Sequence, residues 1–181
     1  MAALAAVTCL FFSSIAAFGS TAEGRAFGFT DPGSAISAPA GFACSGGFKG
    51  GKGNISGPHA PRVTAVRVGH HGDYDRFVIE FSGAVMPGYR VTHHSTTFPL
   101  GTGSVTLKGT NGVFVRLFPV NSSSYQGSTR IRPPFPVLRE ARMVEYSEGH
   151  MNWGLGIRGT PCLRVAVFTA PIRLVVDVAR P

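Results

Sequence analysis

Acidic side chains are scarce in this chain, which has only nine Asp and Glu residues among 181. Lysine and arginine together number 17, so the formal net charge is +8, and 14 of these 17 are arginines. The basic residues are spread along the chain and do not form a run. An excess of positive charge favours anionic partners such as wall polymers, lipid headgroups or nucleic acid. The shortage of carboxylates leaves few groups for acid–base catalysis.

Charge is absent altogether from the first 22 residues, which are rich in alanine, serine and phenylalanine. An apolar run followed by small residues is typical of a secretory leader. We therefore expect residues 1–22 to be a signal peptide or, if uncleaved, an N-terminal anchor, because the run is just long enough to span a bilayer. The protein is then secreted and associated with the cell envelope. Nucleic acid is not an expected partner, and the membrane is expected to be a partner only through an uncleaved leader.

Cysteine is also rare, with three residues in the chain. Cys9 lies in the predicted leader, and Thr8 before it argues against a lipid-attachment site there. Cys44 and Cys162 remain, and in an oxidising compartment two such cysteines are able to pair. A disulfide between them would close a long loop, which is worth ~4 kcal/mol in the chain-entropy model. The sequence alone does not show that the two residues meet.

Glycine and proline dominate residues 23–61, which leave little apolar surface to bury. This segment is predicted to be a flexible linker. Residues 62–181 differ, because short apolar alternations recur there between clusters of Gly, Pro, Asn and Ser. About nine short strands with turns between them, and no helical periodicity, predict an all-β domain with the architecture of a β-sandwich. A domain of about 120 residues is large enough for its own core.

Two matching strand-like segments lie near the two ends of this predicted domain. One begins at Asp75, reads Asp-Arg-Phe-Val-Ile-Glu-Phe and contains Arg76 and Glu80. The other reads Ile-Arg-Leu-Val-Val-Asp-Val and contains Arg173 and Asp177. Alternation places Arg76 and Glu80 on one face of the first segment and its apolar residues on the other, toward the core, and the second segment repeats this order. Arginine and acid pairs on a sheet face usually neutralise each other across strands, so these four charged residues are interpreted as structural, as is Asp75 at the strand entry.

The sequence offers little for catalysis or metal binding. The two strand acids would stay ionised beside arginine, which removes the protonated acid that glycoside hydrolysis needs. The chain has no nucleophile-elbow serine, no phosphate-binding loop and no His-Glu-x-x-His motif. The pairs His70-His71 and His93-His94 each place their rings on opposite faces of a strand, so a pair gives only one ligand to a shared metal. We expect no enzyme activity, metal or cofactor, and we interpret His71 as a hydrogen-bond partner of Asp75.

The candidate ligand-binding residues lie mainly beside turns and in one long loop, where sandwich proteins often place such residues. Two loop arginines would supply positive charge to wall carboxylates or phosphates, and tyrosines would supply polar aromatic tips. The single tryptophan would stack on sugar rings if exposed and belongs to the core if buried. The candidates are Tyr74, Tyr125, Arg130, Arg132 and Trp153.

Several motifs within residues 62–181 together resemble the AMIN-like domain of secreted actinobacterial proteins and lipoproteins. They are the His-x-x-x-Asp-Arg pattern at 71–76, the Pro-Gly-Tyr turn at 87–89, Trp-Gly-Leu-Gly at 153–156 and the Arg-Leu-Val-Val-Asp-Val ending at 173–178. The related AMIN domains of periplasmic amidases and pilus secretins are β-sandwiches that target their hosts to the envelope, with peptidoglycan as the proposed ligand. The resemblance implies a targeting or binding module without catalysis.

Taken together, the sequence predicts an exported cell-envelope binding module that recognises peptidoglycan, a related cell-wall glycan or an anionic wall polymer. Two alternatives remain open at this point. One is a structural subunit, or a module that binds another envelope protein through exposed strand edges. The other is a small envelope hydrolase.

Overall fold

The computed structural model describes Cys44 and residues 49–53, 60–121, 125–160 and 162–179. The predicted leader and most of the predicted linker lie outside the described residues. Within them the strands are β1 (Lys49–Gly51), β2 (Val63–His71), β3 (Tyr74–Phe81), β4 (Gly88–His94), β5 (Thr97–Leu100), β6 (Gly103–Thr106), β7 (Asn111–Phe118), β8 (Arg130–Ile131), β9 (Leu138–Ser147), β10 (His150–Ile157), β11 (Cys162–Thr169) and β12 (Ile172–Ala179). The prediction of an all-β protein is confirmed.

Three of these strands were not expected from the sequence, namely β1, β5 and β8. All three are short, with two to four residues. The first contains two glycines and lies within the predicted linker, the second contains a proline, and the third has only two residues. β1 and β8 are too short for a visible alternation of apolar and polar residues, which needs at least four positions. The proline in β5 argues against a strand at that position.

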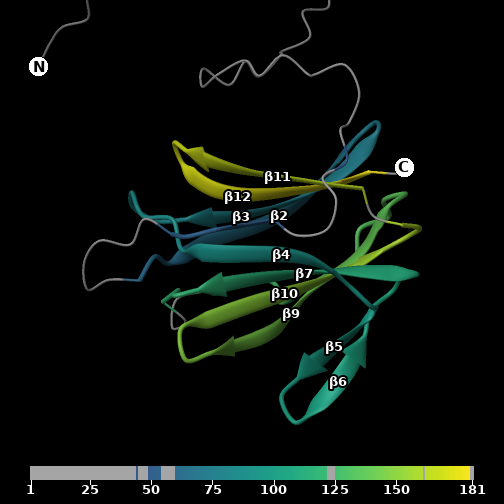
Figure 1. Ribbon diagram of the computed structural model, residues 1–181, viewed down its shortest axis with the longest axis horizontal. Coiled ribbons are helices and arrows are strands. Elements are labelled where there is room, and N and C mark those ends of the chain that lie inside the picture. The colour runs from purple at the N-terminus through teal and green to yellow at the C-terminus, as the bar shows by residue number, and fades with distance from the viewer. Residues whose placement is uncertain (1–43, 45–48, 54–59, 122–124, 161, 180–181) are drawn as a thin grey trace, which may run out of the picture. The chain divides into compact units, whose positions relative to one another are not determined.

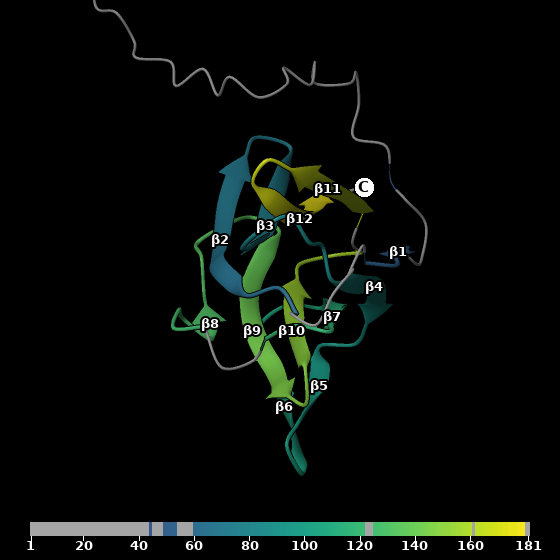
Figure 2. The same cartoon turned by 90° about the vertical axis from the view of Figure 1, so that its left-hand side faces the viewer.

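The strands form two main antiparallel sheets and one hairpin. One sheet has six strands in the order β1-β4-β7-β10-β9-β8, and the other has four in the order β11-β12-β3-β2. Figure 1 shows the four-stranded sheet stacked on the six-stranded one, and Figure 2 shows the same layers turned by 90°. The β5–β6 hairpin extends from the six-stranded sheet on the side away from the other sheet (Figure 1). The architecture is sandwich-like, as the sequence predicts.

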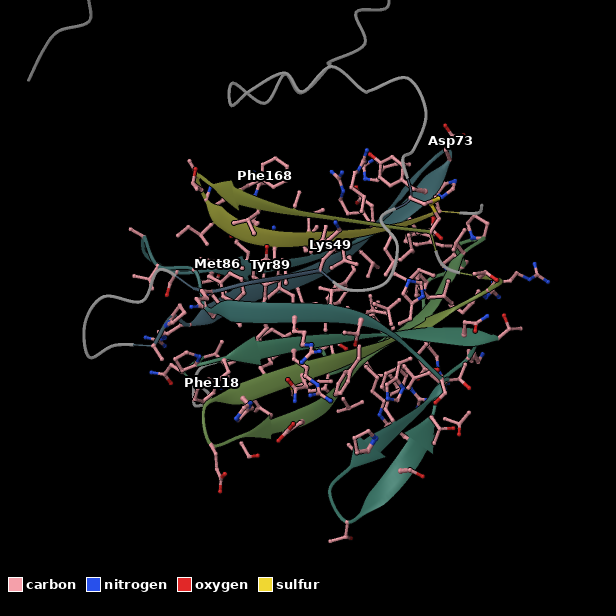
Figure 3. All side chains as sticks on the ribbon, viewed as in Figure 1. Lys49, Asp73, Met86, Tyr89, Phe118 and Phe168 are labelled. Atoms are coloured by element: carbon pink, nitrogen blue, oxygen red, sulfur yellow. A yellow bond between two sulfur atoms is a disulfide. The ribbon has the colours of Figure 1, made fainter. Side chains whose placement is uncertain are left out.

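The core lies between the two sheets and is built from the apolar faces of their strands. Phe77, Ile79 and Phe81 of β3 are at most 2% exposed, as their alternation predicts. Leu174 and Val176 of β12 are fully buried beside them. Burying a side chain of this size is worth ~1.5–3 kcal/mol, so this shared face accounts for much of the driving force for stacking the sheets. Figure 3 shows the side chains that fill the space between the layers.

The Trp-Gly-Leu-Gly motif of β10 separates two packing layers. Trp153 and Leu155 point into the main core, where both are fully buried. Gly154 lies on the outer face of the six-stranded sheet, where the ring of Phe98 from the β5–β6 hairpin would be 3.0 Å from a Cβ. A second small core forms there from Phe98, Leu107, Phe114 and Val144. The glycines of the motif therefore let the hairpin approach the sheet closely.

Cys44 and Cys162 form a disulfide, with their Cα atoms 4.8 Å apart and a sequence separation of 118 positions. The bond joins Cys44, in the predicted linker, to the first residue of β11. Among the residues that the structure describes, no helical segment has the length and the apolar character that crossing a bilayer would require.

Candidate functional site

Asp75 begins the apolar face of β3 and connects the two sheets. Its side chain is fully buried, and one oxygen accepts hydrogen bonds from the backbone N–H groups of Val137 and Leu138, at 2.8 and 2.7 Å. The other oxygen lies 2.7 Å from Nδ1 of His70. A carboxylate used in this way holds the start of β9 against the opposite sheet. The structural interpretation of Asp75 therefore agrees with its contacts.

The predicted partner of Asp75 was wrong by one position. His70 reaches Asp75, whereas His71 stacks on the ring of Tyr74 with centroids 5.0 Å apart. The reason is the alternation of side chains along β2, which turns His70 toward the inner layer that holds Asp75 and His71 toward the outer face. Burial lowers the pKa of His71, and the nearby guanidinium of Arg76 lowers it further.

The outer face of the four-stranded sheet carries a set of arginines that we call the arginine face. The antiparallel registers of β2, β3, β12 and β11 place these residues on the side away from the core. Two carboxylates, Glu80 and Asp177, lie among them. Four guanidiniums against two carboxylates leave this face positively charged. The arginine face consists of Arg67, Arg76, Arg164 and Arg173.

Asp177 is shared by two of these arginines. Nε of Arg76 donates to one of its oxygens at 2.7 Å, and a terminal nitrogen of Arg164 donates to the other at 2.7 Å. The Asp177 side chain is only 2% exposed, whereas the two arginine side chains are 28% and 30% exposed. The hydrogen bond to Asp177 raises the pKa of Arg76 above its usual value. Arg76 and Arg164 therefore neutralise Asp177 across strands, as predicted. Both arginine side chains remain partly exposed to solvent.

An aromatic ring lies beside this ion-pair cluster. The guanidinium carbons of Arg76 and Arg164 lie 5.3 and 5.0 Å from the centroid of the Tyr74 ring. His71 stacks on the same ring. Tyr74, one of the candidate binding residues from the sequence, thus forms part of a cationic and aromatic cluster at one end of the arginine face.

At the other end of the face, Glu80 pairs across strands with an arginine that was not among the predicted structural residues. Glu80 lies opposite Arg173 in the register but forms its ion pair with Arg67, at 2.7 Å. The Arg173 guanidinium lies 5.3 Å from the centroid of the Phe168 ring, and its buried Nε has no hydrogen-bond partner among the described residues. Sequence reasoning missed Arg67 and Arg164, although their positions in alternating strands were the available signal.

The loop arginines Arg130 and Arg132 are not unattached surface charges. Their Nε atoms lie 2.7 and 3.2 Å from the two carboxylate oxygens of Glu140, whose side chain is fully buried. The backbone N–H of Lys108 also donates to Glu140. These arginines are therefore the counterions of a buried acid as well as candidate binding residues. This role was not predictable from the sequence, which does not show that Glu140 is buried.

Trp153 and Tyr125 also differ from the exposed aromatic side chains that sugar stacking needs. Trp153 is fully buried and lies 5.5 Å, centroid to centroid, from Phe77, so its ring offers no face to a ligand. Tyr125 packs edge-on against Trp153, and its hydroxyl donates to the carbonyl of Ser128 at 2.9 Å. Burial raises the pKa of Tyr125. Of the five candidate binding residues, only Tyr74 lies on the arginine face.

Within the described part of the chain, no group of three or more His, Cys, Asp or Glu side chains is arranged to hold a metal ion.

Fold and site together define a basic, disulfide-linked sandwich domain of antiparallel strands with an arginine-rich outer sheet face. Residues 61–180 match the family model of the AMIN-like domain, and the chain belongs to the AMIN-like domain family. AMIN-like domains occur in extracytoplasmic proteins, so the family identifies a cell-envelope-related module. No curated protein matches the chain.

Proposed function

We propose that this protein is an exported binding module that attaches to the cell wall through its arginine face, without catalysis. Its ligand is peptidoglycan or an anionic polymer linked to it. The observation that carries the proposal is the charge of the face, where four arginines surround two carboxylates on one sheet surface. The family supports an envelope role at a coarser level.

The chemistry of the face suits an anionic glycan. A guanidinium offers several N–H donors in one plane and so matches the two oxygens of a carboxylate or phosphate. Tyr74 adds a ring beside two guanidiniums, and such rings contact the apolar faces of sugars. Arg67 is the most exposed member of the face, with 59% of its side chain accessible. It is therefore the arginine best placed to contact a polymer.

The disulfide supports an extracytoplasmic location. Disulfides persist in oxidising compartments and are rare in the reducing cytosol. The bond between Cys44 and Cys162 is thus consistent with export, as the family and the uncharged first 22 residues also indicate.

We propose that the protein has no catalytic activity because several of its carboxylates are paired with arginines. Glu80 is paired with Arg67, Asp177 with Arg76 and Arg164, and Glu140 with two further arginines. A general acid must hold a proton and reach the substrate. Carboxylates whose oxygens are occupied by guanidiniums are poorly suited to that task.

The test is retention on purified sacculi, with and without their anionic polymers. A double variant, Arg67→Gln with Arg173→Gln, removes two charges from the arginine face and leaves both arginine donors of the buried Asp177 in place. The control is Arg62→Gln with Arg158→Gln, which removes the same charge from residues outside the face. We expect about tenfold weaker retention for the first variant, the size of one lost charge-assisted contact, and little change for the control.

Salt provides a second measure of the same interaction. Wild-type retention should fall as the Debye length shrinks from ~10 Å to ~3 Å, because exposed charge pairs are screened over that distance. Equal losses in both double variants, or retention that does not respond to salt, would contradict binding through the arginine face.

A protein-binding role is the second candidate, and one observation favours it. β11 is the last strand of the four-stranded sheet, and Val167 on it is 39% exposed. An edge strand with an apolar side chain is a common docking site for another chain. Sacculi treated with protease distinguish the two candidates, because a protein partner is removed and a wall polymer is not.

A further inference from the structure

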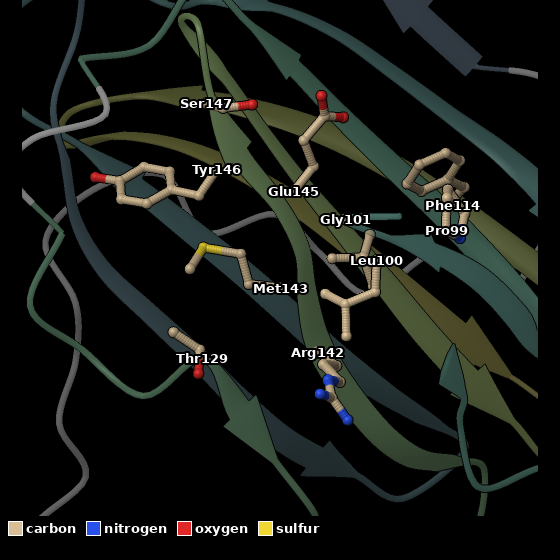
Figure 4. Close-up of a pocket in the computed structure, with 11 residues that line it drawn as sticks. Pro99, Leu100, Gly101, Phe114, Thr129, Arg142, Met143, Glu145, Tyr146 and Ser147 are labelled. Carbon is tan, nitrogen blue, oxygen red and sulfur yellow. The ribbon is translucent and has the colours of Figure 1, made fainter. Parts of the chain in front are cut away.

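A well-formed cleft lies away from the arginine face. It is on the outer face of the six-stranded sheet, between the tip of the β5–β6 hairpin and β9, and has a volume of about 650 Å³. Pockets for small ligands commonly measure about 300–1,000 Å³. Figure 4 shows the residues that line it on both sides of β9. The position of the cleft depends on the β5–β6 hairpin. The hairpin lies close to the sheet because the sheet presents glycines to it.

The middle of the cleft is apolar. Leu100 enters from the hairpin, Phe114 from β7 and Val144 from β9. Phe114 and Val144 also belong to the small core under the hairpin, so this part of the surface is held rigidly. An aliphatic or peptide segment of a ligand would lie mainly against Leu100, because Phe114 and Val144 form the floor of the cleft and are only 3% and 2% exposed.

The two ends of the cleft carry opposite charges from the same strand. Arg142 and Glu145 are three positions apart on β9, but a register shift between Asn152 and Trp153 places them opposite Gly154 and Asn152 of β10. These two partners are two residues apart, which corresponds to roughly 7 Å along the strand. Arg142 and Glu145 therefore face outward from the sheet, on either side of Val144. Figure 4 shows Glu145 at one end and Arg142 at the other, with Leu100 between them.

Neither charge is neutralised by the other. The Arg142 side chain has no hydrogen bond or ion pair with any residue that the structure describes, although it is half-buried. Its neighbour across the β8–β9 ladder is another arginine, Arg130. Glu145 accepts a hydrogen bond from the side-chain amide of Asn152, a neutral group. Arg142 thus supplies positive charge at one end and Glu145 a carboxylate at the other, and the guanidinium of Arg116 lies over the Phe114 ring on the same face, at 4.5 Å.

We infer that this cleft binds a zwitterionic molecule or chain end, with its carboxylate at Arg142 and its ammonium at Glu145. A short uncharged spacer would lie across Leu100, Phe114 and Val144. The ligand chemistry is distinct from that of the anionic polymer proposed for the arginine face, and the two sites lie on different sheets. The same two charges occur at the ends of a short peptide and in a free ω-amino acid.

A series of ω-amino acids measures the proposed spacing directly. Binding of γ-aminobutyrate, ε-aminocaproate and ω-aminocaprylate to the full chain is followed by titration, with the methyl NMR signals of Leu100 and Val144 as local probes. We expect saturable shifts of both signals and an affinity maximum at one spacer length. Caproate and hexylamine, which each lack one charge, should bind at least about tenfold more weakly. Triglycine carries the same charges on a peptide, so its affinity relative to ε-aminocaproate distinguishes the two sources.

Charge variants assign each end of the ligand. Arg142→Met should weaken ε-aminocaproate about tenfold and leave hexylamine unchanged, whereas Glu145→Gln should weaken ε-aminocaproate and leave caproate unchanged. The matched controls are Arg158→Met and Glu148→Gln, two exposed turn positions that do not line the cleft. Thermal unfolding of each variant verifies the fold. The inference is overturned if neither the ω-amino acids nor triglycine give saturable shifts at Leu100 and Val144, or if the control variants weaken binding equally.

Discussion

At the scale of single residues, this protein uses its buried carboxylates to hold structure together. Asp75, Glu140 and Asp177 are each at most 2% exposed. Each accepts at least two hydrogen bonds or ion pairs, from backbone N–H groups, histidine or arginine. A buried charge without such partners is strongly unfavourable. The few acids of the sequence are therefore matched to specific donors, and removal of a donor should be costly.

The first prediction concerns the donors of Glu140. Arg130→Ser combined with Arg132→Ser leaves this buried carboxylate with the Lys108 backbone N–H as its remaining donor. We expect the free energy of unfolding to fall by ~2–3 kcal/mol, below the full cost of breaking a buried pair because both arginines are partly exposed. Urea unfolding at neutral pH measures the change.

Two further variants make this prediction specific. Adding Glu140→Gln to the double variant should recover part of the loss, because a neutral amide is less costly to leave without arginine partners. Arg158→Ser removes a turn arginine and should have little effect on stability. If the double serine variant unfolds like the wild type, the counterion role of the two arginines is wrong.

At the scale of elements, glycines determine where the β5–β6 hairpin packs. A Cβ at Gly112 would collide with the carbonyl oxygen of Ser95, just before the hairpin, and would lie 2.9 Å from the Phe98 ring. A Cβ at Gly156 would collide with the Lys108 carbonyl on the other side of the hairpin. The close approach buries Phe98 completely. The same approach forms the cleft between the hairpin tip and β9.

The second prediction follows from that close approach. Gly112→Ala must displace backbone, so we expect a loss of ~1–3 kcal/mol in stability, typical of overpacking. The loss should be accompanied by faster proteolytic cleavage within the hairpin, because Phe98 can no longer seat fully. Gly103→Ala, in the same hairpin, is the control, since the nearest atom to its Cβ is 3.9 Å away. Equal behaviour of the two variants would contradict the packing argument.

At the scale of the whole molecule, one covalent bond connects a residue of the predicted linker to the sandwich. Cys44 and Cys162 are separated by 118 positions, so their disulfide closes a long loop. In the chain-entropy model such a bond restricts the unfolded chain and thereby stabilises the fold. Stability should then depend on the redox conditions of the compartment.

The third prediction tests that dependence. In a Cys9→Ser background, Cys44→Ser with Cys162→Ser should lower the free energy of unfolding by ~2–4 kcal/mol. A reducing agent should lower the stability of the background protein by a similar amount and have no effect on the double variant. Denaturant unfolding with and without reductant measures both. An identical response of the two proteins to reductant would show that the disulfide is not the source of the effect.

Much of the fold was predictable because its signal is local. The alternation around Phe77 and Ile79 sets which face of β3 is apolar, whatever strand lies beside it. The same holds for Leu174 and Val176 in β12. Short motifs were also sufficient for the family, which the match at residues 61–180 shows. The three unexpected strands have two to four residues each and depend on their neighbours for pairing.

The candidate site was less predictable, because it depends on which side chains meet. The sequence allowed two roles for Trp153, stacking on a sugar or packing in the core. The packing of Phe77 and Tyr125 against its ring shows that it belongs to the core. Arg130 and Arg132 looked like unattached loop charges, since a sequence does not show that Glu140 is buried. Arg67 and Arg164 gained significance only from the sheet register.

The amino-acid sequence was sufficient to predict the strand faces, the all-β class, the family and the excess of positive charge, because each depends on composition or on neighbours along the chain. The pairing of charges, the burial of Trp153 and the cleft between the hairpin tip and β9 became apparent from the folded structure. These features join residues that are far apart in sequence, such as Arg76 and Asp177, which are 101 positions apart. Contacts of that kind depend on sheet register and packing, and a local sequence pattern predicts neither of them.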